Sequence, residues 1–192
     1  MFKEFLSYLI LYGVRDNVIT NNGSGALIFQ REKMYTKFRI LNCLLLMLGI
    51  IVCSAVTYAL NTFVYSKFDL FYINVIVSVF VVCLYNIVVA TIWRKASNFG
   101  HYLYDYSYSY PSDVVYTLSI ILTLDFSLPL VSFILSVAAI VLVVFIMNLF
   151  VGFFIESSNR AYMNVSFRNV PSRLFLLAIF SVLIYYLNML IV

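Results

Sequence analysis

Charged residues are scarce in this sequence, and the scarcity excludes the usual soluble folds. Asp, Glu, Lys and Arg make up only 10% of the 192 residues, whereas apolar types make up 64%. A soluble domain carries about 25% charged and 45–50% apolar residues. A chain of this length leaves much of its area exposed, so a soluble core has no room for so much apolar surface. The mean hydropathy of +1.02 therefore predicts an integral membrane protein whose outer surface contacts the lipid bilayer.

Histidine and cysteine are also scarce, which removes the usual metal-binding and nucleophilic sites. His101 is the only histidine, and Cys43, Cys53 and Cys83 each lie inside an apolar run with no CxxC spacing. This pattern supports neither a zinc site nor a disulfide framework, and small buried hydrophobic residues are the simplest interpretation of the cysteines. Without a second titratable partner for the histidine, no catalytic residue is proposed. The net charge of +4 predicts no nucleic-acid partner.

Uncharged stretches of two lengths follow one another along the chain. The long ones suffice to cross about 30 Å of hydrocarbon, and the short ones are about half a span. The four long stretches are 40–64, 70–93, 127–155 and 174–192, and the two short ones are 5–14 and 114–124. The sequence therefore predicts an all-α integral membrane fold with six embedded segments in a single domain, 1–192.

The order of the stretches is short, long, long, short, long, long. This order predicts two inverted three-segment halves, 1–100 and 101–192, each opening with a half-helix. Lys and Arg gather in three loops, 15–39, 94–113 and 156–173, and they are expected on one side of the membrane. Lys67 and both termini are then expected on the other side. A bacterial or organellar inner membrane is the expected location of this multi-pass chain.

Polar residues beside the two short segments are the candidate functional residues. Asn17 and Asn22 follow the first short segment, and Asp113 and Asp125 bracket the second. Helices that end inside the bilayer leave backbone groups that need a polar environment, and carboxylates there tend to mark ion paths. We therefore expect Asn17, Asn22, Asp113 and Asp125 to form a polar midplane or ion path. The alternatives are a flexible turn, simple boundary residues, and a segment 5–14 that lies flat at the interface.

Tyrosine and asparagine give two further expectations. Five tyrosines alternate with other residues and would share one face of an extended segment. They are expected to form an aromatic belt at the membrane boundary, with stacking on a flavin or quinone as the alternative. The five are Tyr102, Tyr104, Tyr106, Tyr108 and Tyr110. Asparagines within the apolar stretches are expected to make hydrogen bonds between helices. These are Asn42, Asn74, Asn86, Asn148 and Asn188.

The layout and several short motifs resemble the small membrane subunits of the Rnf and Nqr electron-transport complexes (the RnfA, RnfE, NqrD and NqrE family). The motifs are Gly13-Val14-Arg15-Asp16-Asn17-Val18, Arg31-Glu32-Lys33-Met34, Arg94-Lys95-Ala96-Ser97, the stretch from Tyr102 to Pro111, and the loop from Arg160 to Pro171. The resemblance covers the whole chain. It implies six segments in two inverted halves and a place among other membrane subunits of a hetero-oligomeric complex.

In that family each half-helix carries a cysteine, and paired subunits hold an iron–sulfur centre. The matching places here, near Gly25–Ala26 and Asp113–Val115, have no cysteine. The resemblance therefore implies no cofactor on this chain alone, with flavin or iron–sulfur centres on partner subunits. We do not assign cluster ligands to Cys43, Cys53 or Cys83.

The expected function is a subunit of a multi-subunit respiratory or ion-translocating electron-transfer complex, with a structural or ion-path role. At most the chain is a non-catalytic subunit of an oxidoreductase. A divergent NADH dehydrogenase subunit 6 belongs to the same class. The alternatives are the membrane component of a small-solute, vitamin-type transporter and a membrane scaffold without a ligand.

Overall fold

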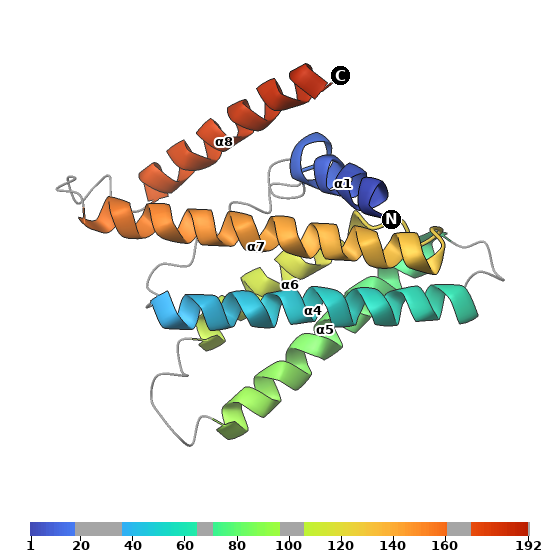
Figure 1. The fold of residues 1–192 in the computed structure, drawn as a ribbon. Coiled ribbons are helices and arrows are strands. Elements are labelled where there is room, and N and C mark those ends of the chain that lie inside the picture. Colours follow the sequence, from blue (N-terminus) through green and yellow to red (C-terminus); the bar gives the residue numbers. More distant parts are fainter. Residues whose placement is uncertain (18–35, 65–70, 97–105, 161–169, 192) are drawn as a thin grey trace.

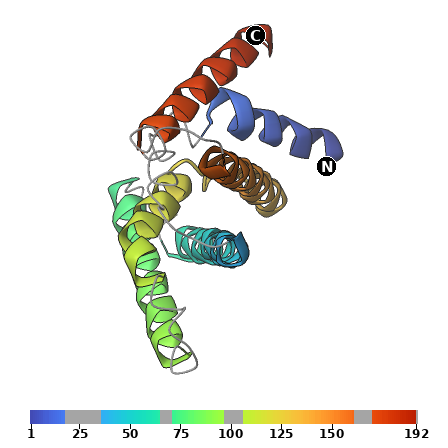
Figure 2. The same cartoon turned by 90° about the vertical axis from the view of Figure 1, so that its left-hand side faces the viewer.

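The computed structural model describes residues 1–17, 36–64, 71–96, 106–160 and 170–191. In these residues the regular secondary structure is helical throughout, as the composition predicts. Helices α4 (Thr36–Phe63) and α7 (Leu130–Arg160) run side by side, and α7 lies between α1 (Phe2–Ile10) and α4, whereas α8 (Val170–Ile191) runs obliquely to them (Figures 1 and 2).

Three helices are long and apolar enough to cross a membrane. They are α4 (Thr36–Phe63), α5 (Phe71–Ala96) and α7 (Leu130–Arg160). Their apolar windows of 20 or 21 residues match the thickness of the hydrocarbon layer. The predicted stretches 40–64, 70–93 and 127–155 thus correspond to these helices. The coarse prediction of a helical membrane protein is confirmed, and the count of six embedded segments stays a prediction.

The interior of the bundle is filled by branched apolar side chains. Ile50 of α4, Ile120 of α6 (Tyr106–Leu122) and Ile140 of α7 all have 0% exposure and belong to one cluster. A second, smaller cluster joins Cys53, Val82 and Ile121 of α4, α5 and α6. These contacts set the register in which the four helices pack.

Helices α4 and α5 approach closely at a single glycine. A Cβ on Gly49 would lie 2.8 Å from Cε1 of Tyr85, so the tyrosine ring lies against the bare backbone of α4. The hydroxyl of Tyr85 also donates a hydrogen bond to the carbonyl of Leu45, at 3.3 Å. Beyond this contact α5 diverges from the bundle in Figure 1.

The first short segment is a helix that packs along α7. It comprises α1 (Phe2–Ile10) and a π-helical turn, η1 (Leu11–Arg15). The chain's first residue lies at the end of the molecule where α7 begins, so α1 and α7 run in the same direction (Figure 1). Tyr12 is buried in the main cluster, and Phe5, Tyr8 and Leu9 pack against it.

The second short segment is longer than predicted. Helix α6 begins at Tyr106 rather than Val114, and its 17 residues rise about 25 Å. Hydropathy did not predict the first two turns of α6, because they consist mainly of tyrosines and serines, which are helical here but not apolar. Tyr106, Tyr108 and Tyr110 are therefore helical, and their alternation does not bring all three to one face. Tyr102 and Tyr104 lie outside the described residues.

The last helix, α8 (Val170–Ile191), packs mainly on η1 and touches α7 through its aromatic side chains. The rings of Phe150 and Phe180 meet edge to face, with centroids 5.0 Å apart. Figure 1 shows that α8 starts at the end where α7 finishes and where α4 starts. The end of α7 and the starts of α4 and α8, which adjoin the basic loops 156–173 and 15–39, therefore lie at one end of the bundle.

Candidate functional site

The candidate site lies at the inner end of η1, which packs against α7 and α8. The backbone N–H of Asp16 donates to the carbonyl of Leu11 at 2.7 Å, five residues back, as in a π-helical turn. Such turns are rare and often mark functional positions. The helix ends directly after it, because the backbone of Asp16 leaves the helical region.

Asn17 closes the end of the turn. Its amide Nδ2 donates to the carbonyl of Gly13 at 2.6 Å, and the side chain is only 1% exposed. Carbonyls at a helix end lack a partner within the helix, and inside a bilayer no water replaces it. The Asn17 amide therefore allows the helix to end in apolar surroundings.

Contacts with α7 give the depth of η1. Tyr12 is hydrogen-bonded to Ser136, and a Cβ on Gly13 would lie 3.5 Å from Cγ2 of Val143. Ser136 and Val143 are about 9 Å and about 20 Å along α7 from Leu130, at 1.5 Å per residue. The hydrocarbon layer is about 30 Å thick. If α7 crosses the bilayer, Gly13 lies about two thirds of the way along that crossing, and η1, which runs in the same direction as α7, ends beyond that level.

Tyr12 packs η1 against α7 and has two carboxylates in its neighbourhood. The hydroxyl of Ser136 donates to the carbonyl of Phe133 at 2.8 Å and lies within hydrogen-bond reach of the Tyr12 hydroxyl. Tyr12 is 5% exposed and Ser136 is 0% exposed. The carboxylates of Asp16 and Asp125 are near enough to act electrostatically on the Tyr12 phenol.

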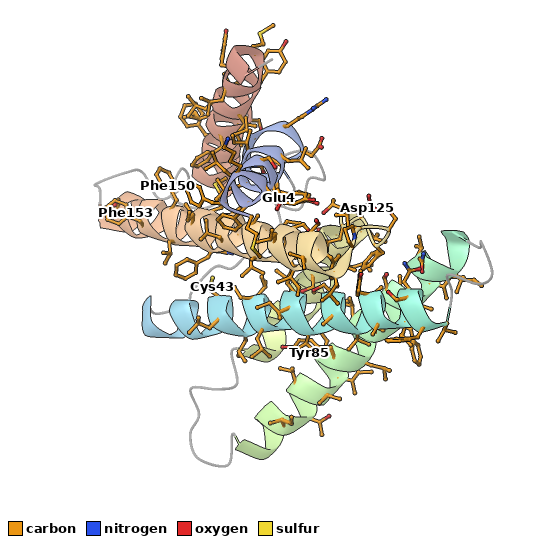
Figure 3. All side chains as sticks on the ribbon, turned by 45° about the vertical axis from the view of Figure 1, so that its right-hand side comes forward. Glu4, Cys43, Tyr85, Asp125, Phe150 and Phe153 are labelled. Atoms are coloured by element: carbon orange, nitrogen blue, oxygen red, sulfur yellow. The ribbon has the colours of Figure 1, made fainter. Side chains whose placement is uncertain are left out.

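Asp125 lies on the loop between α6 and α7, at the end of the bundle where α7 begins. One carboxylate oxygen accepts hydrogen bonds from the N–H of Ser127 at 2.9 Å and from its hydroxyl at 2.6 Å. In Figure 3 Asp125 is on the same side of the molecule as Glu4, far along α7 from Phe150 and Phe153. Asp125 is exposed.

Helix α4 fixes this loop through two side chains. The Tyr58 hydroxyl donates to the carbonyl of Leu128, and the Asn61 amide donates to the carbonyl of Phe126, both at 3.1 Å. The ring of Tyr58 also stacks on Phe133 of α7, with centroids 4.3 Å apart. The position of Asp125 relative to η1 is therefore set by packing between helices.

The four residues expected to share a polar site are spread over more than one place. Asn17 is buried at the end of η1, and Asp125 is exposed on the loop. Asp113 is in α6, nine residues before the end of that helix, so about 14 Å of helix separates it from the loop that bears Asp125. The side chain of Asp113 and the whole of Asn22 lie outside the described residues.

Asparagines in the long helices bond differently from the prediction. The amides of Asn86 and Asn148 donate to the carbonyls of Val82 and Val144, four residues back in their own helices. The expectation of bonds between helices is wrong for these amide donors. In the described part of the chain, the buried Oδ1 of Asn74 has no partner. The side chains of Asn42 and Asn188 are not among those that the structure describes.

The three cysteines are spread over two helices, α4 and α5. Cys43 and Cys53 lie on one helix, about 15 Å apart along its axis. Cys53 packs among apolar side chains from α5 and α6. Among the described residues, no group of three or more His, Cys, Asp or Glu side chains is close enough to hold a metal ion.

Sequence reasoning missed Tyr12, Ser136 and Asp16 as members of this site. Tyr12 and Ser136 are uncharged residues inside apolar runs, where hydropathy treats them as packing residues. Asp16 stood out only as part of the motif Gly13-Val14-Arg15-Asp16-Asn17-Val18. The available signal was the run Gly13–Asn17. Within five residues it contains a glycine, one basic residue, one acidic residue and an amide, which together interrupt an apolar helix.

Comparisons of the chain with protein-family models, with curated proteins and with solved structures give no match. The resemblance to the Rnf and Nqr membrane subunits therefore stays a prediction from the sequence.

Proposed function

We propose that this chain is an integral membrane subunit of a multi-subunit respiratory or ion-translocating electron-transfer complex. Its role there is structural, and it supplies part of an ion path. Redox groups belong to partner subunits in this proposal. The resemblance of the sequence motifs supports the class of complex, and the inner end of η1 supports the ion path.

The observation that carries the ion path is a polar helix end that packs beside a candidate membrane span. Arg15 and Asp16 are exposed there, directly before the buried Asn17. Ionisable residues are costly inside the bilayer and generally face a cavity, an ion path or a partner. If the helix served only to pack against α7, ending at the membrane surface would place its charged residues at a lower free energy.

The packing of the interior favours this role over a small-solute carrier. A carrier of vitamin size binds its substrate in a pocket that buries most of the ligand. Here the space between α4, α6 and α7 is taken by Ile50, Ile120 and Ile140, which are fully buried. A solute would have to displace these side chains.

Purification in mild detergent tests the proposal. A tagged full-length chain, expressed in its native cells, is expected to bring down other membrane subunits together with flavin or iron–sulfur absorbance. The tagged variant Ile140→Asp, which places a carboxylate in the packed interior, is a matched control for non-specific capture. Recovery of the chain with a pair of ATPase subunits, or as an isolated species, would contradict the proposed role.

A further inference from the structure

Helix α6 ends beside the middle of two candidate membrane spans. Its second-last residue, Ile121, is 0% exposed and belongs to one small cluster with Cys53 of α4 and Val82 of α5. Cys53 is the middle residue of the apolar window Cys43–Phe63 in α4. Val82 is the tenth of the 20 residues in the window Ile73–Ile92 of α5. If these two helices cross the bilayer, α6 therefore ends near its middle.

A non-helical segment, 123–129, continues from this point to the start of α7. Figure 1 shows α6 stopping part-way along α4, short of the end where α7 begins. The far part of the segment is held by α4: the Asn61 amide donates to the carbonyl of Phe126, and the Tyr58 hydroxyl donates to that of Leu128. Tyr58 and Asn61 belong to the last six residues of α4. Together, α6 and segment 123–129 thus cover successive parts of the depth that α4 spans alone.

Polar and apolar residues alternate along segment 123–129. The apolar side chains belong to the main core cluster or pack against it, and they are Leu124, Phe126 and Leu128. Of the polar side chains between them, Thr123 is half-buried, whereas Asp125 and Ser127 are exposed. The polar side of the segment is therefore turned away from the core. It extends from the end of α6 to the end of the bundle where α7 begins.

The backbone of the segment also calls for a polar neighbour. Non-helical backbone inside the hydrocarbon layer is tolerated only where it is buried in protein or lines a water-filled cavity. Within the described part of the chain, no hydrogen bond to the backbone carbonyls of Thr123, Leu124 and Asp125 is found. Water provides donors for these carbonyls and hydrates the exposed carboxylate of Asp125, whereas lipid does neither.

We propose that segment 123–129 lines a water-filled vestibule for cations, which opens where α7 begins and reaches inward to the end of α6. The inference rests on the proposed ion-path function and deepens it by naming the side of access and the sign of the ion. The carboxylate of Asp125 gives the vestibule a negative potential, and a cavity lined by charge of one sign concentrates counter-ions. Thr123 marks the inner end of the vestibule.

Cysteine accessibility in membranes of the native cells tests the proposal on the full-length chain. With the three native cysteines replaced, Thr123→Cys is expected to react with a cationic, water-soluble methanethiosulfonate, from the same membrane side as Ser127→Cys. Ile51→Cys is the matched control for depth, because Ile51 is 48% exposed and only about 3 Å along α4 from Cys53. Lipid covers that side chain, so it is expected to stay unreactive. Both variants should react fully once unfolded in SDS.

A second arm tests the sign of the ion. At Thr123→Cys the cationic reagent is expected to react about 10-fold or more faster than an anionic reagent of similar size, after correction for their rates with a free thiol. The additional substitution Asp125→Asn should remove most of this preference. Equal reactivity of Thr123→Cys and Ile51→Cys, reaction of Thr123→Cys from the opposite side, or a preference that survives Asp125→Asn would each overturn the proposal. Because labelling requires no identified partner, its failure is distinguishable from failure of the co-purification test.

Discussion

Replacing Gly49 by alanine is expected to weaken the packing of α4 on α5. The new Cβ would lie 2.8 Å from Cε1, 3.3 Å from Cζ and 3.4 Å from the hydroxyl of Tyr85. The ring must therefore move, and overpacking of this kind costs about 1–3 kcal/mol. Moving the ring also weakens the Tyr85 bond to the carbonyl of Leu45, a contribution of about 0.5–1.5 kcal/mol. The better helix propensity of alanine offsets at most about 1 kcal/mol.

The expected net loss for Gly49→Ala is about 1–2 kcal/mol, given these opposing contributions. Reversible unfolding of the detergent-solubilised chain by SDS, followed by circular dichroism or tryptophan fluorescence, measures it. Gly13→Ala is the matched control, because its Cβ would lie at an ordinary contact distance of 3.5 Å from Val143. The loss should disappear when Gly49→Ala is made in a Tyr85→Ala background. Equal effects of the two glycine substitutions, or a loss that persists without Tyr85, would refute the reasoning.

Three further substitutions test other contacts by the same unfolding assay. Asn17→Ala leaves the Gly13 carbonyl without its donor and is expected to lower the free energy of unfolding by about 1–3 kcal/mol. A change smaller than the assay error would show that the cap is dispensable. Asn61→Ala releases the loop between α6 and α7 and should cost about 1 kcal/mol, with faster proteolysis of that loop. Ile140→Ala opens a cavity and should cost about 2–5 kcal/mol, while the half-exposed Ile146→Ala should stay within about 0.5 kcal/mol; similar costs would contradict the assigned faces of α7.

The long helices could be predicted from the sequence because their length and apolarity are set by the bilayer. The stretch 127–155 corresponds to α7. Pro129 marks the start of this helix, because the Pro129 carbonyl accepts its first hydrogen bond, from the N–H of Phe133. The short segments were harder, because hydropathy measures apolarity and not helicity. The start of α6 at Tyr106 was missed for this reason, while α1 and η1 agree closely with the predicted 5–14.

The candidate site could be predicted only in part. Asn17 follows a break in a helix, and such a break is visible in the sequence. Its proximity to Tyr12 and Ser136 depends on α1 packing parallel to α7, and pairing of distant helices leaves no local signal. Asp113 and Asp125 looked equivalent because they bracket one apolar run, yet about 14 Å of α6 lies between Asp113 and the loop that bears Asp125.

The central claim is that a short N-terminal helix enters the membrane and ends inside it against α7. A nitroxide spin label on a single cysteine measures depth through its relative collision rates with oxygen and with a water-soluble nickel complex. With the three native cysteines replaced, labels at Gly13 and at Val143 in the full-length chain in liposomes should report the same depth, well below that of a label at Phe2. A label at Gly13 that reports the shallow depth of Phe2 would place the helix flat on the membrane surface and contradict the account.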